Sequence, residues 1–180
     1  NDLELADQTN NNVRILTIAK PVTYGLSIAG TTVTSANVHA ITGNGIQGTV
    51  SFAPAAGNEP ATLTLNNASI TGNIEVSDLS ALKINVVGTN TITAGAVSAI
   101  KSNLATGACA LTFSRADDGD CSLTLSSTDV TVISTGFSGP TYEAMALVAE
   151  GEQVDYRSDY GLSDYVDSEY AAVTSATITS

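Results

Sequence analysis

Apolar and polar residues alternate in short runs along most of the first 135 residues. Alternation with a period of two is typical of β-strands that bury one side. It predicts strands at 13–18, 25–29, 48–53, 62–65, 73–76, 82–87, 110–113, 122–125 and 130–133. Between these runs lie Gly, Asn, Ser, Thr and Asp residues, which favour tight turns. No segment before residue 140 has the spacing of an amphipathic helix, so the predicted fold class is all-β.

The predicted strands form a loose internal repeat. Four segments begin with the same apolar-x-apolar pattern, at Leu63, Leu82, Leu111 and Leu123. A strand, a turn, a second strand and a variable loop, repeated every ~20 to 30 residues, favour a single-stranded right-handed parallel β-helix with stacked coils. In this interpretation residues 1–23 form the N-terminal lead-in and cap, residues 24–140 the coils, and residues 141–180 the last coil and an acidic, tyrosine-rich C-terminal cap.

Asparagines interrupt the strand pattern, most clearly in the sequence TLTLNNASI at 62–70. Asparagine tolerates left-handed backbone angles, and its side chain can replace ladder hydrogen bonds that are lost at a corner. We therefore expect corner or turn residues that keep neighbouring coils in register, rather than ligands, at Asn66, Asn67, Asn85 and Asn90.

Composition adds two constraints. Apolar residues make up 43% of the 180-residue chain, but aromatic residues only 5%, so the core is expected to consist of aliphatic layers. The net charge of −12 repels phosphate backbones and anionic surfaces, which argues against nucleic acid as a partner.

No apolar run is long enough to span a bilayer, so no membrane insertion is expected. The polar N-terminus does not have the pattern of a signal peptide, so for an exported protein the sequence would begin either after processing or at an arbitrary boundary.

The C-terminal segment combines acidic residues with tyrosines at Tyr156, Tyr160, Tyr165 and Tyr170. Exposed tyrosine beside carboxylates can stack on sugar faces and bind sugar hydroxyls, so these four are candidate binding residues. Two alternatives stay open: the rings cover the open end of the coil, or the segment is disordered. The stretch 143–154 is read either as a helix or as a late strand, and the closing AAVTSATITS as a final strand.

A short loop between two predicted strands contains three carboxylates, Asp117, Asp118 and Asp120, with Arg115 beside them. Carboxylates on a turn can bind calcium, and calcium with a basic residue supports proton abstraction in polysaccharide lyases. The same sequence is also an ordinary solvated turn. Calcium at this loop is the one cofactor that the sequence suggests.

Cys109 and Cys121 each precede a strand leucine by two residues, which suggests equivalent places on neighbouring strands. They are candidates for a disulfide in an exported protein, with two separate buried thiols as the alternative. The only histidine, His39, lies in an unrelated segment, so no catalytic thiol is indicated. The sequence GNGIQG at 43–48 matches a dinucleotide fingerprint, but it is followed by a predicted strand where that fingerprint requires a helix.

Residues 24–70 contain three linked motifs: YGLSIAGTTVTSAN, GTVSF and TLTLNNASI. In these motifs the chain resembles uncharacterised surface-exposed proteins and carbohydrate-binding-domain-like modules of gut bacteria. The matching positions are Tyr24, Leu26, Ile28, Gly30, Val33, Thr34, Asn37, Gly48, Thr49, Val50, Ser51, Phe52 and 62–70. The later LKINVVGTNTI and the paired LTF and LTL strands are similar to the coils that follow, whereas the acidic C-terminus departs from the pattern.

The resemblance implies a right-handed parallel β-helix at a bacterial cell surface or in the extracellular space, with glycan binding or adhesion as its role. We therefore expect an exported, non-catalytic protein that binds a glycan or a surface protein. One alternative is a polysaccharide lyase or glycoside hydrolase, which would gain support if Lys83, Lys101 and Arg115 lined one face with the three loop aspartates. The other is a structural spacer of a larger surface assembly, which would have no ligand.

Overall fold

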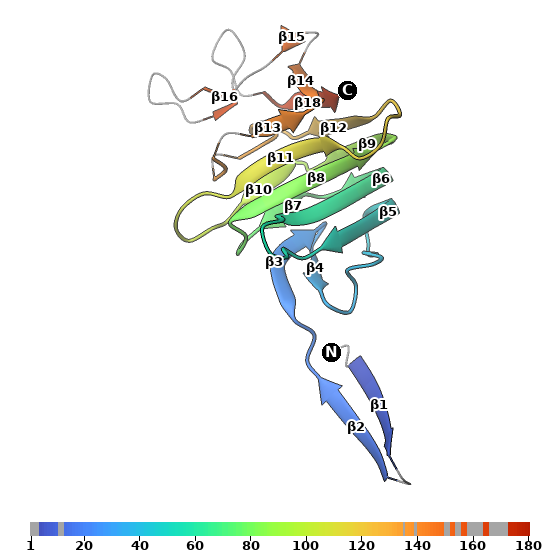
Figure 1. Ribbon diagram of the computed structural model, residues 1–180. Helices are drawn as coiled ribbons and strands as arrows, with labels where there is room; N and C mark the ends of the chain where they lie inside the picture. Colours follow the sequence, from blue (N-terminus) through green and yellow to red (C-terminus); the bar gives the residue numbers. More distant parts are fainter. Residues whose placement is uncertain are drawn as a thin grey trace.

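The computed structural model describes residues 4–10, 13–134, 136–138, 140–149, 152–153, 156–157, 164–165 and 173–180. All elements assigned in these residues are strands, which confirms the all-β prediction (Figure 1). They are β1 (Glu4–Asn10), β2 (Val13–Ala19), β3 (Thr23–Ile28), β4 (Thr31–Thr34), β5 (Ile46–Ala53), β6 (Ala61–Thr71), β7 (Ile74–Val76), β8 (Ala81–Val87), β9 (Thr89–Thr93), β10 (Ile100–Ser102), β11 (Ala110–Arg115), β12 (Ser122–Ser126), β13 (Thr141–Glu143), β14 (Ala146–Ala149), β15 (Glu152–Gln153), β16 (Tyr156–Arg157), β17 (Asp164–Tyr165) and β18 (Ser175–Thr179).

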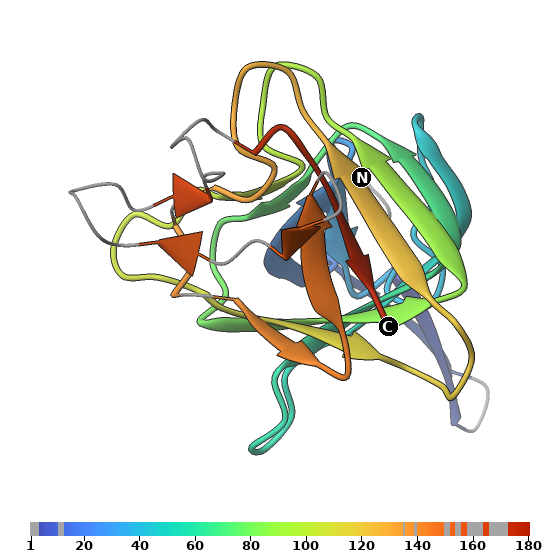
Figure 2. The same ribbon diagram turned by 90° about the horizontal axis from the view of Figure 1, so that it is seen from above.

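Strands β3 to β15, together with β18, form three walls that wrap almost completely around one core (Figure 2). The first wall contains β5, the first half of β6, β8, β11 and β13. The second contains the end of β6, β9, β12, β18 and β14. The third is a four-stranded sheet in the order β10, β7, β3, β4. The hairpin of β1 and β2 extends away from these walls (Figure 1).

Strand direction differs between the middle and the ends of the stack. In the middle, β6, β8 and β11 pair in parallel on the first wall, β6, β9 and β12 on the second, and β7 and β10 on the third. At the ends, β5 pairs antiparallel with β6, β3 with β4 and β7, and β18 with β12 and β14. The sheets are therefore mixed, and the finer prediction of a parallel β-helix stays a prediction.

The core is aliphatic and layered, as the composition indicates. In β8, for example, Leu82, Ile84 and Val86 are buried while the residues between them face outward. The few aromatic rings lie near the two ends of the stack. Tyr24 and Phe52 are in contact on β3 and β5, and Phe113 stacks on Tyr142 between β11 and β13. The rings thus add apolar contact area at the ends of the stack.

Asn90 fixes the corner between the first and second walls. Its side chain is fully buried, and its Oδ1 accepts a hydrogen bond from the backbone N–H of Ala68 at 2.8 Å. Its Nδ2 donates to the carbonyl oxygens of Val87 at 2.9 Å and Ser122 at 3.3 Å. One side chain therefore joins three successive strand layers, which confirms its predicted corner role.

Of the other three asparagines, Asn66 and Asn67 lie at the same corner and Asn85 lies inside a strand. Asn67 has a left-handed backbone, with φ of 48°, and its Oδ1 accepts a hydrogen bond from the N–H of Thr89, so it too is a corner residue. Asn66 precedes it and accepts a hydrogen bond from its side-chain amide. Asn85 was wrongly predicted: it lies inside β8 and faces outward, because the strand continues past it to Val87.

Several strand boundaries also differ from the predictions. β6 continues through the asparagine pair to Thr71, because Asn67 turns the backbone without ending the ladder. The segment 130–133 is not a strand, and only a single bridge joins Ile133 to Ile100. The stretch 143–154 contains strands β14 and β15 rather than a helix, and the final strand is present as β18. GNGIQG is followed by a strand rather than a helix, as expected, but its last three residues already belong to β5.

Candidate functional site

The outward side of the second wall consists only of hydroxyl residues over four strands. β6, β9, β12 and β18 each point alternate residues into the core and away from it. Strand register aligns the outward residues in three columns of three, four and four, which we call the hydroxyl face: Thr89, Ser122 and Thr179; Ser69, Thr91, Thr124 and Thr177; Thr71, Thr93, Ser126 and Ser175. The face contains no charged and no aromatic side chain.

Hydroxyls in neighbouring strands of this face bond to one another. Thr91 Oγ1 donates to Ser69 Oγ at 3.2 Å, and the hydroxyls of Thr124 and Thr177 lie 3.2 Å apart. In the next column Ser126 Oγ donates to Thr93 Oγ1 at 3.3 Å. Each such bond uses one of the two O–H groups in a pair, so the other O–H and most lone pairs remain open to a ligand. The bonds also restrict side-chain rotation, which leaves the oxygens ordered before any ligand arrives.

The spacing of this array is set by the sheet itself. Neighbouring strands lie ~4.8 Å apart, and alternate residues of one strand ~6.7 Å apart. The antiparallel β18 continues the columns, because reversing a strand does not change which of its residues face outward. The columns end at β14, where Thr177 is opposite Val148 and Thr179 is opposite Ala146. The hydroxyl face is therefore bounded by an apolar strand on that side.

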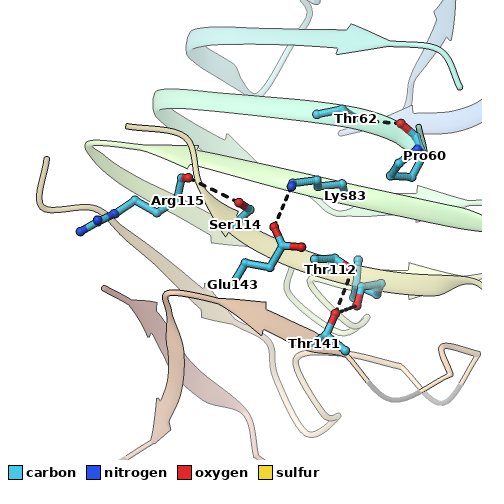
Figure 3. A network of polar contacts seen from close by, with 9 residues as sticks. Pro60, Thr62, Lys83, Thr112, Ser114, Arg115, Thr141 and Glu143 are labelled. Carbon is cyan, nitrogen blue, oxygen red and sulfur yellow. Dashed lines mark hydrogen bonds and ion pairs between the residues drawn. The ribbon is translucent and has the colours of Figure 1, made fainter. Parts of the chain in front are cut away.

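The first wall presents a different surface, which we call the mixed face (Figure 3). Its outward residues form two rows across β6, β8, β11 and β13: Thr62, Lys83, Thr112 and Thr141; Thr64, Asn85, Ser114 and Glu143. Lys83 Nζ lies 2.7 Å from Glu143 Oε2, and the hydroxyls of Thr112 and Thr141 lie 2.9 Å apart. Hydrogen bonds from Lys83 and Ser114 keep the pKa of Glu143 below its usual value.

All three central cations named by the sequence analysis have acidic partners. Lys83 pairs with Glu143, and Arg115 Nη2 lies 3.6 Å from Asp118 Oδ1. Lys101 lies on β10, in the third wall, 3.9 Å from Glu75 Oε2. The three cations therefore do not share a face, and the arrangement that would favour a lyase or hydrolase is not formed.

The acidic loop follows β11 at the edge of the mixed face. Asp117 Oδ1 accepts a hydrogen bond from the N–H of Gly119, which is the geometry of a simple turn, and the Asp118 side chain is fully exposed. Within the part of the chain that the structure describes, no three His, Cys, Asp or Glu side chains are grouped to bind a metal. The structure thus does not bring Asp117, Asp118 and Asp120 together as calcium ligands.

The structure contains Cys109 and Cys121 as free, buried thiols. They do not lie on neighbouring strands: Cys109 precedes β11 on the first wall, and Cys121 precedes β12 on the second. The extended strand β11 lies between them, and its six residues span ~20 Å. A disulfide requires Cα atoms within ~7 Å, so the structure does not bring the candidate pair together. Burial raises the pKa of Cys109 to about 11.

None of the four candidate tyrosines is among the described side chains. Backbone pairing joins Tyr156 in β16 to Tyr165 in β17, in a two-stranded antiparallel ribbon. Tyr160 and Tyr170 lie outside the described residues. The binding role of these four residues stays a prediction.

One open recess lies at the corner between the third and first walls. Its volume is about 360 Å³, and it is lined by 55, 57–61 and 78–81. Glu59 and Asp78 are its only charged residues, and both are exposed.

Among the described residues no helix is long and apolar enough to cross a membrane.

Sequence reasoning did not identify the hydroxyl face. The signal was present in TNTIT at 89–93, SLTLS at 122–126 and SATIT at 175–179. Each places hydroxyls at every second position, but a strand alone does not reveal which neighbours complete the array. Comparisons with protein-family models, curated proteins and solved structures give no match to this chain. Its function must therefore be argued from its surfaces.

Proposed function

We propose that the chain is an exported, non-catalytic bacterial surface domain that binds a neutral glycan on its hydroxyl face. The observation that supports this most is the composition of that face: on the second wall, every outward position of β9, β12, β18 and the end of β6 is serine or threonine. Hydroxyls both donate and accept hydrogen bonds, as do the hydroxyls of a sugar. A grid of them can therefore match a polymer that presents hydroxyls repeatedly.

Charge favours a neutral ligand. The chain has a net charge of −12, which repels uronate-containing and sulfated polysaccharides during approach. On the hydroxyl face itself no cation offsets that repulsion. On the first wall, Lys83 and Arg115 are already ion-paired with Glu143 and Asp118. A neutral glycan is thus the hydroxyl-rich polymer that the electrostatics of the described surface permits.

The hydroxyl face lacks the aromatic rings on which sugars stack. Each contact is therefore a hydrogen bond with a net value of ~1 kcal/mol, too weak to retain a monosaccharide. Contacts that repeat along a polymer add, as in other multivalent binding. We expect measurable binding for polysaccharides and longer oligosaccharides only.

The scaffold we propose for this function is a right-handed parallel β-helix. Parallel pairing of β6, β8 and β11 on one wall and of β6, β9 and β12 on the next supports it. In this interpretation the antiparallel strands are caps at the two ends. Stacked coils place equivalent side chains at one spacing, which is what a repetitive ligand requires.

Binding to insoluble and soluble polysaccharides tests the proposal. Cellulose, β-1,3-glucan and mannan are the neutral probes, and polygalacturonate is the acidic one; each is offered with calcium and with a chelator. We expect calcium-independent retention on at least one neutral polymer, with no release of reducing or unsaturated ends. Release of such ends would contradict a non-catalytic role and favour a lyase or hydrolase. Absence of all binding would favour protein adhesion or a structural spacer.

Matched variants locate the binding surface. Thr91→Lys places a long charged side chain in the central column of the hydroxyl face. Thr64→Lys makes the same change on β6 at a half-buried outward position of the mixed face. We expect Thr91→Lys to abolish retention and Thr64→Lys to preserve it, with both variants showing the circular dichroism of the wild type. Loss of retention in Thr64→Lys alone would place the site on the mixed face.

A further inference from the structure

The arrangement of hydroxyls within the face also bears on how a glycan would lie, and this inference rests on the function proposed above. A linear chain can follow one strand, or it can cross the strands along a column. The geometry points to the second: we infer that the hydroxyl face takes a neutral, linear glycan that runs across the strands, with successive sugars against β6, β9, β12 and β18.

The spacing of the hydroxyls favours a chain that crosses the strands. Down a column, hydroxyls recur every ~4.8 Å, the distance between neighbouring strands, whereas along one strand they recur only every ~6.7 Å. A chain that crosses the strands thus meets a chemically equivalent group at each step with the shorter repeat. The central column does this over four residues: Ser69, Thr91, Thr124 and Thr177.

The extent of the wall around the hydroxyls also favours a chain that crosses the strands. Along a strand the hydroxyls stop at corners where the backbone leaves the wall, after Asn67 at one end and at Gly72 and Ala94 at the other. Across the strands the same wall continues beyond the hydroxyls to β14. A linear chain that follows a column therefore remains over protein, and one that follows a strand does not.

Hydrogen bonds between hydroxyl groups of the face also favour this orientation. The three that form run down the columns, while Ser126 and Thr179 also donate to backbone carbonyl oxygens. Thr91 bonds to Ser69, Thr124 to Thr177, and Ser126 to Thr93. Between Thr91 and Thr124 the structure gives no hydrogen bond, although the two residues are register partners. Their oxygens remain open toward a ligand between two bonded pairs, and bonded neighbours polarise each other as donors and acceptors.

The absence of charge on the two longer columns favours a neutral chain. The two longer columns lie side by side and are uncharged over all their length, within a strongly acidic chain. A chain between them would have hydroxyls on both flanks and the threonine methyl groups beneath its C–H faces. No described group on this face would favour a charged substituent over a hydroxyl.

Oligosaccharide length tests the orientation. Calorimetric titration with cello- and manno-oligosaccharides of two to six residues would give the affinity at each length. We expect affinity to increase about fivefold per added sugar, the value of roughly one net hydrogen bond, up to about four sugars. Beyond that length the chain reaches β14, whose outward residues have no hydroxyl, so the affinity should stop increasing.

Two lysine substitutions separate the orientations. Thr177→Lys blocks the β18 end of the central column, and Thr89→Lys blocks one end of the β9 row. We expect Thr177→Lys to move the plateau from about four sugars to about three, while Thr89→Lys leaves it unchanged. Ser175→Lys, exposed on the same strand, repeats the test if Thr177→Lys does not fold.

The remaining outcomes overturn different parts. Weaker binding in Thr89→Lys with no change in Thr177→Lys would overturn the orientation and leave glycan binding intact. Wild-type binding that neither variant changes would overturn the hydroxyl face as the site. A wild type that binds no neutral glycan of any length would overturn the proposed function and, with it, this inference.

Discussion

The hydroxyl face and the mixed face lie on one continuous sheet, have the same kind of aliphatic core behind them, and differ only in their outward residues. On the mixed face Lys83 and Glu143 pair with each other, and at its edge Arg115 forms an ion pair with Asp118. On the hydroxyl face the pairs are hydroxyls, which retain donors and acceptors after pairing. The alternation of apolar and polar residues thus determines the fold. The outward residues of each strand determine what the wall can bind.

The largest loss of stability is expected at the corner between the two faces. Asn90→Ala removes the buried amide that joins the walls and leaves the N–H of Ala68 without its partner. We expect a loss of ~3 kcal/mol in the free energy of unfolding, because several buried hydrogen bonds disappear together. Urea denaturation measures it.

Asn85→Ala is the matched control for that experiment. Asn85 faces outward from β8, and its side chain makes no hydrogen bond with the described residues. We expect its replacement to change the free energy of unfolding by less than ~0.5 kcal/mol. Equal losses in the two variants would show that Asn90 has no special role at the corner.

A glycine at the same corner gives the next largest effect. Gly88 has φ of 62°, and a Cβ atom there would collide with the side chain of Asn67. Gly57 has φ of 60°, and a Cβ there would meet no atom within 4 Å. We expect Gly57→Ala to cost ~1 kcal/mol from backbone strain alone and Gly88→Ala ~1 kcal/mol more. Thermal unfolding of both variants isolates the effect of the collision; equal costs would contradict it.

Acid and salt should affect the mixed face and not the hydroxyl face. The pKa of Glu143 is lowered in the folded state, so its contribution to stability is present above its unfolded pKa of about 4.5 and is lost as the pH falls through the folded value. Its side chain is 56% exposed, so the contribution stays below ~1 kcal/mol. Glu143→Gln should therefore be less stable than wild type at pH 7 and low salt, but equally stable at pH 2. A difference that persists at pH 2 would point to packing instead of charge.

The smallest effect concerns the thiols, one before a strand of each face. Because Cys109 and Cys121 are free thiols separated by β11, we expect no change in the unfolding midpoint when a reductant is added. The pKa of Cys109, raised to about 11, also predicts negligible alkylation of that residue in the folded protein at pH 8. Thermal unfolding with and without reductant checks the first point, and mass spectrometry after alkylation checks the second. A mass two hydrogens lower before reduction would reveal a disulfide.

Sequence reasoning succeeded where one residue type determines local structure. Alternation located β8 and β12, since burial of every second residue needs no knowledge of neighbours. It missed β9 as a full strand, because Asn90 occupies a core position that apolar counting does not recognise. It also mistook Asn85 for a corner, because an asparagine on an outward strand position and one in a turn look alike in sequence.

The candidate sites required more than local pattern. Tripeptides such as Thr91–Thr93 are common in strands, and only the register shows that Ser69, Thr91, Thr124 and Thr177 share a column. The same information shows that Lys101 is on another wall than Lys83, and that Cys109 and Cys121 are separated by a strand. Register in a stacked sheet depends on loop lengths such as 94–99 and 103–109, which follow no fixed period here.

The most direct test of the central claim is the perturbation of backbone amide signals in nuclear magnetic resonance spectra when a neutral glycan is added. The probe is a cello- or manno-hexaose, chosen to match the polysaccharide on which the protein is retained. We expect perturbations at Ser69, Thr91, Thr124 and Thr177, and none at Thr64, Lys83 or Thr112. Perturbations confined to the mixed face would contradict the account, because they would place the glycan on the wall whose charges are already paired.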